Sequence, residues 1–298
     1  MREAIRTAGT RAGDCRRPSI HFWYRILRKG SLSERHIIGE DAGREERMEP
    51  GRSSAIVTGA ASGLGAASAA ALAAHGATVI GLDLADSIDK PVPPPGVRLV
   101  SADVTSEAEV RAALDTLSDE QPLRIAVNCA GIAPAQRILS SRGPHDLGLF
   151  RSTVEVNLVD TFNVLRLAAE RIAAAPPDAQ GQRGVIVNTA SVAAFEGQIG
   201  QAAYAASKGG VASLTIQAAR DLARNGIRVN TIAPGIVDTP MMASLSEEVR
   251  QGLAESVVFP QRLAAPGEYA KMVLAIIDND YLNGETIRLD GAIRMGPR

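Results

Sequence analysis

Tyr204 and Lys208 stand four residues apart, and this pair has the clearest capacity for chemistry in the sequence. Within a helix, residues at i and i+4 share one face, so both side chains can point into the same cleft. An ordinary tyrosine has a pKa of about 10 and is a poor base at neutral pH. A neighbouring ammonium stabilises the phenolate and lowers that pKa, so we expect Tyr204 to act as a general acid and base.

Lysine at position 208 is itself informative, because only four of the 32 basic residues in the chain are lysines. A compact ammonium on a flexible stem can reach ribose hydroxyls in a way that a bulky guanidinium does not match. Ser191 adds a hydroxyl that can donate a hydrogen bond to a substrate oxygen as charge develops there. A tyrosine–lysine pair alone is also typical of a solvated helix face, so the surrounding motifs decide between the two interpretations.

A glycine-rich stretch runs from Thr58 to Gly65, with the spacing G-x-x-x-G-x-G between an expected strand and an expected helix. Glycines allow a tight turn and a close backbone approach, and a helix N-terminus favours the pyrophosphate of a dinucleotide. Packing of a helix against a strand is the alternative explanation for such a loop. The predicted cofactor-binding residues here are Gly59, Ser62, Gly63, Leu64 and Gly65.

Asp83 ends the next expected strand, 18 residues after Gly65. A carboxylate at this place can bind the ribose hydroxyls of adenosine, and its charge would repel a 2′-phosphate. No basic residue follows it closely, so the sequence predicts NAD as the cofactor in preference to NADP. The alternative is an ordinary strand-end aspartate that caps a turn.

The elements that must position these residues follow a regular alternation from Arg52 onward. Short runs rich in Val and Ile predict strands at Ala55–Val57, Thr78–Leu82, Val97–Ser101, Ile125–Asn128, Val185–Asn188, Ile227–Ile232 and Glu285–Leu289. Helical stretches are expected between them, at Ala66–His75, Glu107–Leu117, Phe150–Ala174, Ala203–Arg224 and Pro266–Ile277. Apolar strands that alternate with helices predict a single doubly wound α/β domain of the Rossmann type over residues 48–298, with a parallel sheet flanked by helices on both faces.

Residues 1–47 differ from the rest, with eleven basic and seven acidic residues and the only tryptophan, Trp23. They lack sustained apolar periodicity and the pattern of a secretory signal. We expect either a disordered extension or upstream codons translated ahead of a natural start at Met48.

Composition excludes several classes of function. The 298 residues carry a formal net charge of −1 and 45% are hydrophobic, which excludes disorder for most of the chain and gives no support to a nucleic-acid or membrane role. Two cysteines and four scattered histidines lack ligand spacing, so no metal site is expected. A reducing compartment, the cytoplasm, is the predicted location.

Several of these motifs together resemble the short-chain dehydrogenase/reductase family over about residues 52–298. The resemblance rests on Thr58–Gly65, Asn128-Cys129-Ala130-Gly131, Asn157, Ser191, Tyr204-x-x-x-Lys208 and Pro234-Gly235. It implies a catalytic tetrad in which Tyr204 exchanges the hydroxyl proton and Ser191 orients the substrate oxygen. Lys208 would hold the nicotinamide ribose, and Asn157 would organise a proton-relay water.

The same resemblance implies further cofactor contacts. Asp103 and Val104 would lie near the adenine, and Val237 and Thr239 near the nicotinamide carboxamide. The remaining residues of this set are Cys129, Ala130, Gly131, Tyr204, Lys208, Pro234 and Gly235. Cys129 replaces the asparagine usual at its position, so cofactor contact there is expected to use the backbone.

A narrower resemblance concerns Asn188–Lys208, Phe259-Pro260 and Leu282–Met295, which look like the type II 3-hydroxyacyl-CoA dehydrogenases within that family. Those enzymes oxidise short and branched 3-hydroxyacyl-CoA thioesters with NAD and also accept hydroxysteroids. By this likeness Gln198 would help Ser191 and Tyr204 to bind the substrate, and Pro240–Leu263 would be a mobile lid. The loop Pro134–Asp146 departs most from that pattern.

Within this lid, Met241, Met242 and Leu245 could meet an acyl chain. Ordinary packing of these apolar side chains is the alternative interpretation.

The sequence therefore predicts NAD-dependent interconversion of a secondary alcohol and a ketone, with 3-hydroxyacyl-CoA as the leading substrate. A hydroxysteroid dehydrogenase and a 3-oxoacyl-carrier-protein reductase are the alternatives within the enzyme class. A non-catalytic NAD-binding subunit of a complex is the alternative from another class. The resemblance also implies a homotetramer, in which the two long helices pair between subunits.

Overall fold

The computed structural model describes residues 50–89, 93–118, 120–242 and 245–297, which lie within one compact unit. The predicted extension at residues 1–47 lies outside the described residues. Among the described residues, no helix has the length and apolar character needed to cross a membrane.

A seven-stranded sheet forms the centre of the molecule, with the order β3-β2-β1-β4-β7-β8-β9 and every pairing parallel. Its strands are β1 (Ser54–Thr58), β2 (Thr78–Asp83), β3 (Val97–Ser101), β4 (Leu123–Asn128), β7 (Gly184–Thr189), β8 (Ile227–Pro234) and β9 (Thr286–Leu289). Strands β1, β7 and β8 are buried along their whole length, as the continuous apolar runs predict.

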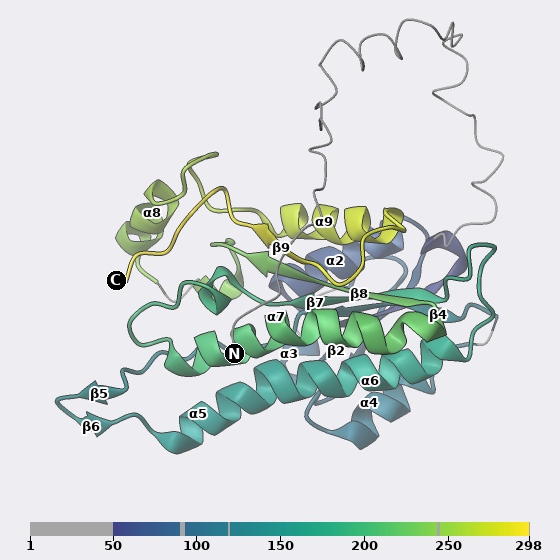
Figure 1. Ribbon diagram of the computed structural model, residues 1–298, viewed down its shortest axis with the longest axis horizontal. Coiled ribbons are helices and arrows are strands. Elements are labelled where there is room, and N and C mark those ends of the chain that lie inside the picture. Colours follow the sequence, from purple (N-terminus) through teal and green to yellow (C-terminus); the bar gives the residue numbers. More distant parts are fainter. Residues whose placement is uncertain (1–49, 90–92, 119, 243–244, 298) are drawn as a thin grey trace, which may run out of the picture. The chain divides into compact units, whose positions relative to one another are not determined.

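Helices cover both faces of this sheet (Figure 1). On one face, α2 (Gly63–Ala74) and α9 (Pro266–Asp278) pack together over one apolar cluster. On the other face, α4 (Glu107–Leu114), α6 (Asp160–Ala173) and α7 (Ala202–Leu222) enclose a second cluster. The prediction of a doubly wound α/β fold is confirmed.

The strand order reverses between β1 and β4, and ligands of such folds bind in the crevice at the carboxyl ends of the strands at this point. Thr58, Asp83, Asn128 and Thr189 are the last residues of their strands. The parallel sheet therefore brings the predicted motif residues to a single edge.

The helix expected over Phe150–Ala174 begins earlier and is not uniform. It consists of α5 (Leu147–Val154), the π-helical segment η3 (Glu155–Val159) and α6. It begins at Leu147 because Asp146 caps it, with Oδ1 accepting hydrogen bonds from the amide nitrogens of Gly148 at 2.6 Å and Leu149 at 3.4 Å.

Several short elements were not predicted, since few of their residues carry a periodic apolar pattern. They are η2 (Pro50–Arg52), α3 (Ala85–Ile88), the hairpin of β5 (Leu139–Ser140) and β6 (Gly143–Pro144), η4 (Val192–Ala194), η5 (Ala223–Asn225), η6 (Pro240–Met242) and α8 (Glu247–Glu255). The hairpin falls in the loop that departs most from the type II pattern, and α8 falls in the expected lid.

Candidate active site

Asn157 lies in the π-helical segment η3 and is fully buried. Its Oδ1 accepts a hydrogen bond from the Ile132 amide at 2.8 Å, and its Nδ2 donates to the Ile132 carbonyl at 2.9 Å and to Ser207 Oγ at 3.0 Å. A π-bulge inside an α-helix often marks a functional position. Here it lies within the predicted catalytic set.

Gly131 lies between the side chains of Asn157 and Lys208. A Cβ atom at this glycine would lie 2.9 Å from Asn157 Oδ1 and 3.5 Å from Lys208 Nζ. The loop after β4, the π-helical segment and α7 therefore converge within a few ångströms. Any side chain at position 131 would fill the space between the two polar groups.

Lys208 is 4% exposed, and its Nζ donates a hydrogen bond to the Thr189 carbonyl oxygen at 2.8 Å. The same nitrogen lies 5.9 Å from the centre of the Tyr204 ring. Burial lowers the pKa of Lys208 to about 8. An arginine in this enclosed place would need room for a larger, planar head group, which agrees with the choice of lysine.

The Tyr204 phenol lies within hydrogen-bond reach of the Ser191 hydroxyl. Burial raises the pKa of the Tyr204 phenol, and a hydrogen bond from Ser191 acts in the opposite direction. Ser191 is itself buried, and its Oγ accepts a hydrogen bond from the Ala193 amide at 3.1 Å. This arrangement leaves the serine proton for the phenol oxygen.

The sequence predicts that Lys208 lowers the pKa of Tyr204, but in this structure burial raises that pKa and the opposing contribution comes from Ser191. The ammonium lies beside the ring of the tyrosine and is hydrogen-bonded to Thr189. Removing the phenolate from water therefore decides the direction of the Tyr204 pKa.

Two glycines of the loop between β1 and α2 stand where a side chain does not fit. Gly59 has φ of +65°, and a Cβ on it would lie 3.0 Å from the Ala130 amide nitrogen. A Cβ on Gly65 would lie only 2.1 Å from the Gly59 carbonyl oxygen. The backbone here is packed so closely that glycine is required at both positions.

Asp83 joins β2 to the glycine loop. Its Oδ2 accepts a hydrogen bond from the Ala61 amide at 2.9 Å, and its Oδ1 accepts one from the Leu84 amide at 2.9 Å. Turn capping is therefore one role of this carboxylate. Each oxygen has a second lone pair, so the same group can also accept hydrogen bonds from ribose hydroxyls.

Cys129, Ala130 and Thr58 join the ends of β4 and β1. Thr58 Oγ1 accepts hydrogen bonds from the amides of Cys129 at 3.0 Å and Ala130 at 3.1 Å. The Cys129 thiol lies inside, 3.6 Å from Thr189 Oγ1 and 3.8 Å from the Tyr269 hydroxyl, and burial raises its pKa. A backbone contact from residue 129 to a cofactor would thus use atoms other than its amide N–H.

The later cofactor-site residues follow β8. Pro234 ends this strand, and the Gly235 amide donates to the Leu289 carbonyl at 2.9 Å. Val237 is buried and forms a bridge with Ala264.

Thr239 follows on the same segment, and its Cγ2 lies 3.4 Å from the position of a Cβ on Gly63. The segment after β8 therefore closes against the glycine loop. Ser62 and Leu64 stand on either side of Gly63, at the N-cap and in the first turn of α2.

Asp103 and Val104 lie just beyond β3 and make contacts of their own. Asp103 Oδ1 accepts from the Thr105 amide at 2.9 Å, and the Val104 carbonyl accepts from Asn163 Nδ2 at 3.1 Å. Gln198 is turned toward the C-terminal segment, where its Nε2 donates to the Gly296 carbonyl at 3.4 Å.

Comparisons with known proteins identify the family of this chain. The family model described as short chain dehydrogenase matches residues 53–250. The chain belongs to the short-chain dehydrogenase family. The 3-hydroxyacyl-CoA dehydrogenase type-2 of Bos taurus is 54% identical to this short-chain dehydrogenase over 250 residues, covering 82% of this chain and 95% of the relative.

Two further relatives agree. The Homo sapiens protein of the same name is 53% identical over 249 residues, covering 82% of this chain and 95% of the relative. The crystal structure of a 3-hydroxyacyl-CoA dehydrogenase type-2 from Mycobacterium avium superposes with a TM-score of 0.78 and 47% identity, covering 83% of this chain and 97% of that chain. The chain is thus a short-chain dehydrogenase similar to the type-2 enzymes.

Sequence reasoning missed three residues of this short-chain dehydrogenase site. Thr58 is the first residue of the glycine motif and the last residue of β1, and its hydroxyl accepts hydrogen bonds from the loop after β4. A hydroxyl side chain directly before the glycine loop is the signal that could have indicated this role. The Thr189 carbonyl oxygen accepts a hydrogen bond from Lys208 Nζ, and Ser207 Oγ accepts one from Asn157 Nδ2. Neither of these two carries a local signal, because each acts on a residue far away in the chain.

Proposed function

We propose that this short-chain dehydrogenase oxidises 3-hydroxyacyl-CoA thioesters to 3-oxoacyl-CoA with NAD. The observation that carries the proposal is the convergence of Asn157, Gly131, Lys208, Tyr204 and Ser191 at the carboxyl edge of the sheet. The relatives whose names specify 3-hydroxyacyl-CoA dehydrogenase match nearly their whole length, which supports the substrate class.

The residues at the switch point fit a dinucleotide. The turn at Gly59 and Gly65 carries no side chain that would obstruct a pyrophosphate, and the N-terminus of α2 would face it. Asp83 would accept the ribose hydroxyls and oppose a 2′-phosphate, which supports NAD. Lys208 would hold the nicotinamide ribose. The bound nicotinamide would supply the hydride acceptor.

The catalytic residues would act on the hydroxyl of the substrate. Ser191 donates a hydrogen bond to the substrate oxygen and so orients the carbinol carbon. Tyr204, as phenolate, accepts the hydroxyl proton while the carbon–oxygen bond becomes a carbonyl. Asn157 holds the backbone at Ile132 and, next to Lys208, would organise a water that passes the proton outward.

Two groups of exposed apolar side chains follow the strands that carry the site. Met241, Leu245 and Val249 are exposed in the segment of η6 and α8, and Ile138 and Leu139 are exposed at the start of the β5–β6 hairpin. Both groups follow the carboxyl ends of strands and lie at the same end of the molecule (Figure 1). Exposed apolar clusters beside a cleft suit the acyl chain of a thioester.

A second copy of the chain is the proposed partner, in a homotetramer. A groove of about 450 Å³ runs between α6 and α7 and is lined by Phe162, Leu165, Leu214 and Ala218, among others. Phe162 is 47% exposed there, and Ile216 of α7 is exposed as well. A cytoplasmic location is proposed with it, and the free thiol of Cys129 suits a reducing compartment.

The test is the initial rate of NAD⁺ reduction by the purified protein. The substrates are 3-hydroxybutyryl-CoA, 2-methyl-3-hydroxybutyryl-CoA and estradiol, and the series is repeated with NADP⁺. Fast oxidation of a thioester with NAD⁺ alone would support the substrate and the role of Asp83.

Other outcomes discard parts of the proposal. Oxidation of the steroid alone would keep the mechanism and reject the thioester. Tight NADH binding without turnover of any alcohol would favour a non-catalytic NAD-binding subunit.

A further inference from the structure

Residues 195–201 connect η4, which follows Ser191, to α7, which carries Tyr204. This connection forms only turns and one isolated bridge, so backbone ladders do not hold it in place. It carries Gln198, to which the resemblance to the type II 3-hydroxyacyl-CoA dehydrogenases gives a part in binding the substrate. Some other part of the molecule has to hold this segment.

The C-terminal segment at residues 290–297 lies against it. The Ile199 amide donates to the Pro297 carbonyl at 3.0 Å, and Gln198 Nε2 donates to the Gly296 carbonyl at 3.4 Å. Neighbouring residues of the two segments are therefore tied to each other, although they lie almost 100 positions apart in the chain.

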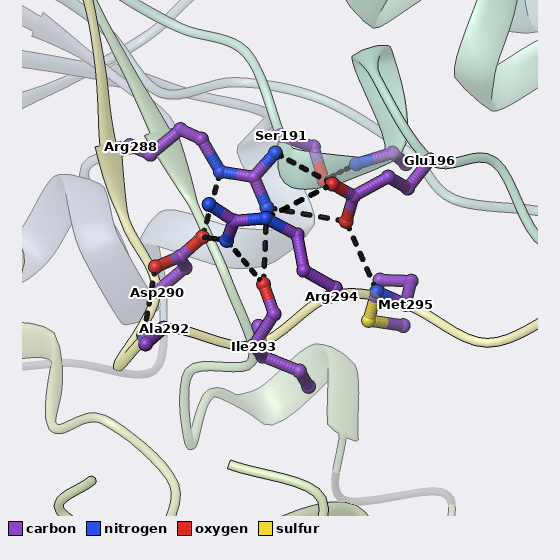
Figure 2. Close-up of polar contacts among 9 residues, drawn as sticks. Ser191, Glu196, Arg288, Asp290, Ala292, Ile293, Arg294 and Met295 are labelled. Atoms are coloured by element: carbon purple, nitrogen blue, oxygen red, sulfur yellow. Dashed lines mark hydrogen bonds and ion pairs between the residues drawn. The ribbon is translucent and has the colours of Figure 1, made fainter. Parts of the chain in front are cut away.

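Glu196 is the centre of this contact (Figure 2). Arg288 holds its carboxylate in a bidentate pair, with Nη1 to Oε1 at 2.9 Å and Nη2 to Oε2 at 3.2 Å. Arg294 Nε lies 3.4 Å from Oε1, and the Met295 amide donates to Oε2 at 3.0 Å. Both oxygens are thus occupied by charged or backbone donors from the C-terminal part of the chain.

Asp290 continues the network toward the cofactor segment (Figure 2). Its Oδ2 accepts hydrogen bonds from Arg288 Nε at 2.7 Å and Arg294 Nη1 at 3.1 Å, and its side chain is only 9% exposed. A Cβ on Gly235 would lie 2.9 Å from Asp290 Cα. The two arginines therefore join the 195–201 connection to the strand end that precedes Val237 and Thr239.

Arg288 also packs on the connection itself, because its guanidinium lies 5.5 Å from the centre of the Phe195 ring. The pair with Glu196 is about three-quarters buried on both sides, which protects it from screening by salt.

We propose that Glu196 is a positioning residue for substrate binding. Through Arg288 and Arg294 it fastens the 195–201 connection to the C-terminal segment and so places the backbone that carries Gln198. The effect on substrate binding rests on the proposed function and on the role that the resemblance implies for Gln198, but the fastening of the connection does not.

The first test is steady-state kinetics of Glu196→Gln on whichever alcohol the wild-type protein oxidises. The amide removes the charge and one acceptor while preserving the shape. Loss of charge-assisted hydrogen bonds should raise the KM for the alcohol by about five- to tenfold. The KM for NAD⁺ and kcat should stay within about twofold of the wild type, since the cofactor strands keep their own contacts.

Glu107→Gln is the matched control. Glu107 on α4 also pairs with two arginines, Arg111 at 2.9 Å and Arg166 at 2.5 Å, and it makes none of the contacts of the 195–201 connection. Its loss should leave the KM for the alcohol unchanged. The proposal is overturned if Glu196→Gln shifts this KM no more than Glu107→Gln, or if the KM for NAD⁺ rises equally.

Arg288→Gln completes a double-mutant cycle. Because Arg288 and Glu196 act through one contact, the double variant should raise the KM for the alcohol by less than the product of the single effects. Multiplicative effects would show that the two residues act separately and would contradict the proposal.

Hydrogen exchange of the backbone amides gives a readout that needs no substrate. In Glu196→Gln the amides of residues 197–201 should exchange faster than in the wild type, while those of α4 stay unchanged. Unchanged exchange in 197–201 would refute the fastening itself. Faster exchange with no turnover by the wild type would refute the proposed function alone.

Discussion

At the scale of single residues, burial acts in opposite directions on the two groups that the sequence brings together. It raises the pKa of Tyr204 and lowers the pKa of Lys208 to about 8, so it shifts each side chain toward its neutral form. The hydrogen bond from Ser191 lowers the pKa of Tyr204 and so favours the phenolate. Proton transfer at Tyr204 therefore depends on the hydroxyl of a neighbouring residue.

Tyr204→Phe tests this assignment. Removing the hydroxyl that exchanges the substrate proton should lower kcat by about 10²–10⁴-fold. NADH binding, measured by fluorescence titration, should stay within about twofold because the ring remains. Tyr281→Phe is the control with the same chemical change on a fully exposed tyrosine, and it should behave as the wild type. Normal turnover by Tyr204→Phe would show that the mechanism is wrong.

Asp160 is a second residue on which burial acts strongly. It is 2% exposed, and its Oδ2 has no hydrogen-bond partner among the residues that the structure describes. Burial raises its pKa to about 7, with smaller contributions from Glu155 and Asp103. The unfolded pKa is about 3.9, so the folded protein binds the proton more tightly and its stability falls as pH rises from about 4 to about 7.

Asp160→Asn should abolish this dependence. The free energy of unfolding of the variant minus that of the wild type should be about 2–3 kcal/mol larger at pH 8 than at pH 5, since the amide does not ionise. Urea denaturation at the two pH values measures it. An equal difference between variant and wild type at pH 5 and pH 8 would contradict the raised pKa.

At the scale of elements, two helical segments of the site differ from the regular helices that the sequence pattern predicts. Helix α2 begins at Gly63, three residues before the predicted start, because its first turn consists of the glycine loop itself. The π-helical segment likewise interrupts what the sequence pattern indicates as one long helix, and it carries Asn157. Both irregularities coincide with predicted functional residues.

Gly65→Ala tests the packing of the glycine loop. The new Cβ would lie 2.1 Å from the Gly59 carbonyl oxygen and 2.8 Å from that of Thr58, so the backbone has to shift. We expect at least about tenfold weaker NADH binding and a lower Tm. Gly267→Ala is the control in the first turn of α9, where a Cβ meets nothing within 4 Å, and it should leave both unchanged or raise the Tm. Equal effects of the two substitutions would contradict the interpretation.

At the scale of the whole molecule, the face formed by α6 and α7 has an apolar groove and exposed Phe162. A homo-oligomer would bury this surface, and charge placed there would oppose association.

Phe162→Glu should therefore shift the mass measured by light scattering after gel filtration toward smaller species. Tyr281→Glu changes a fully exposed aromatic residue in the same manner and should not. An unchanged mass for Phe162→Glu would show that this face is not an interface.

Much of the fold could be predicted because its signals are local. Runs such as Ala55–Val57 and Val185–Asn188 lie within the observed strands β1 and β7, and the parallel order follows from their alternation with helices. Short capped elements such as α8 escaped prediction, since one capping serine and nine residues give little periodicity.

By itself, the sequence determined the residue types that do the chemistry and the strand ends and helix face that hold them. Only the tertiary structure decided their surroundings: the Thr189 carbonyl under Lys208, the pKa directions set by burial, and the pairing of Glu196 with Arg288, 92 residues away. The physical reason is range. The periodicity of helices and strands depends on residues a few positions apart in the chain, whereas desolvation and ion pairing depend on which distant segments the fold brings together.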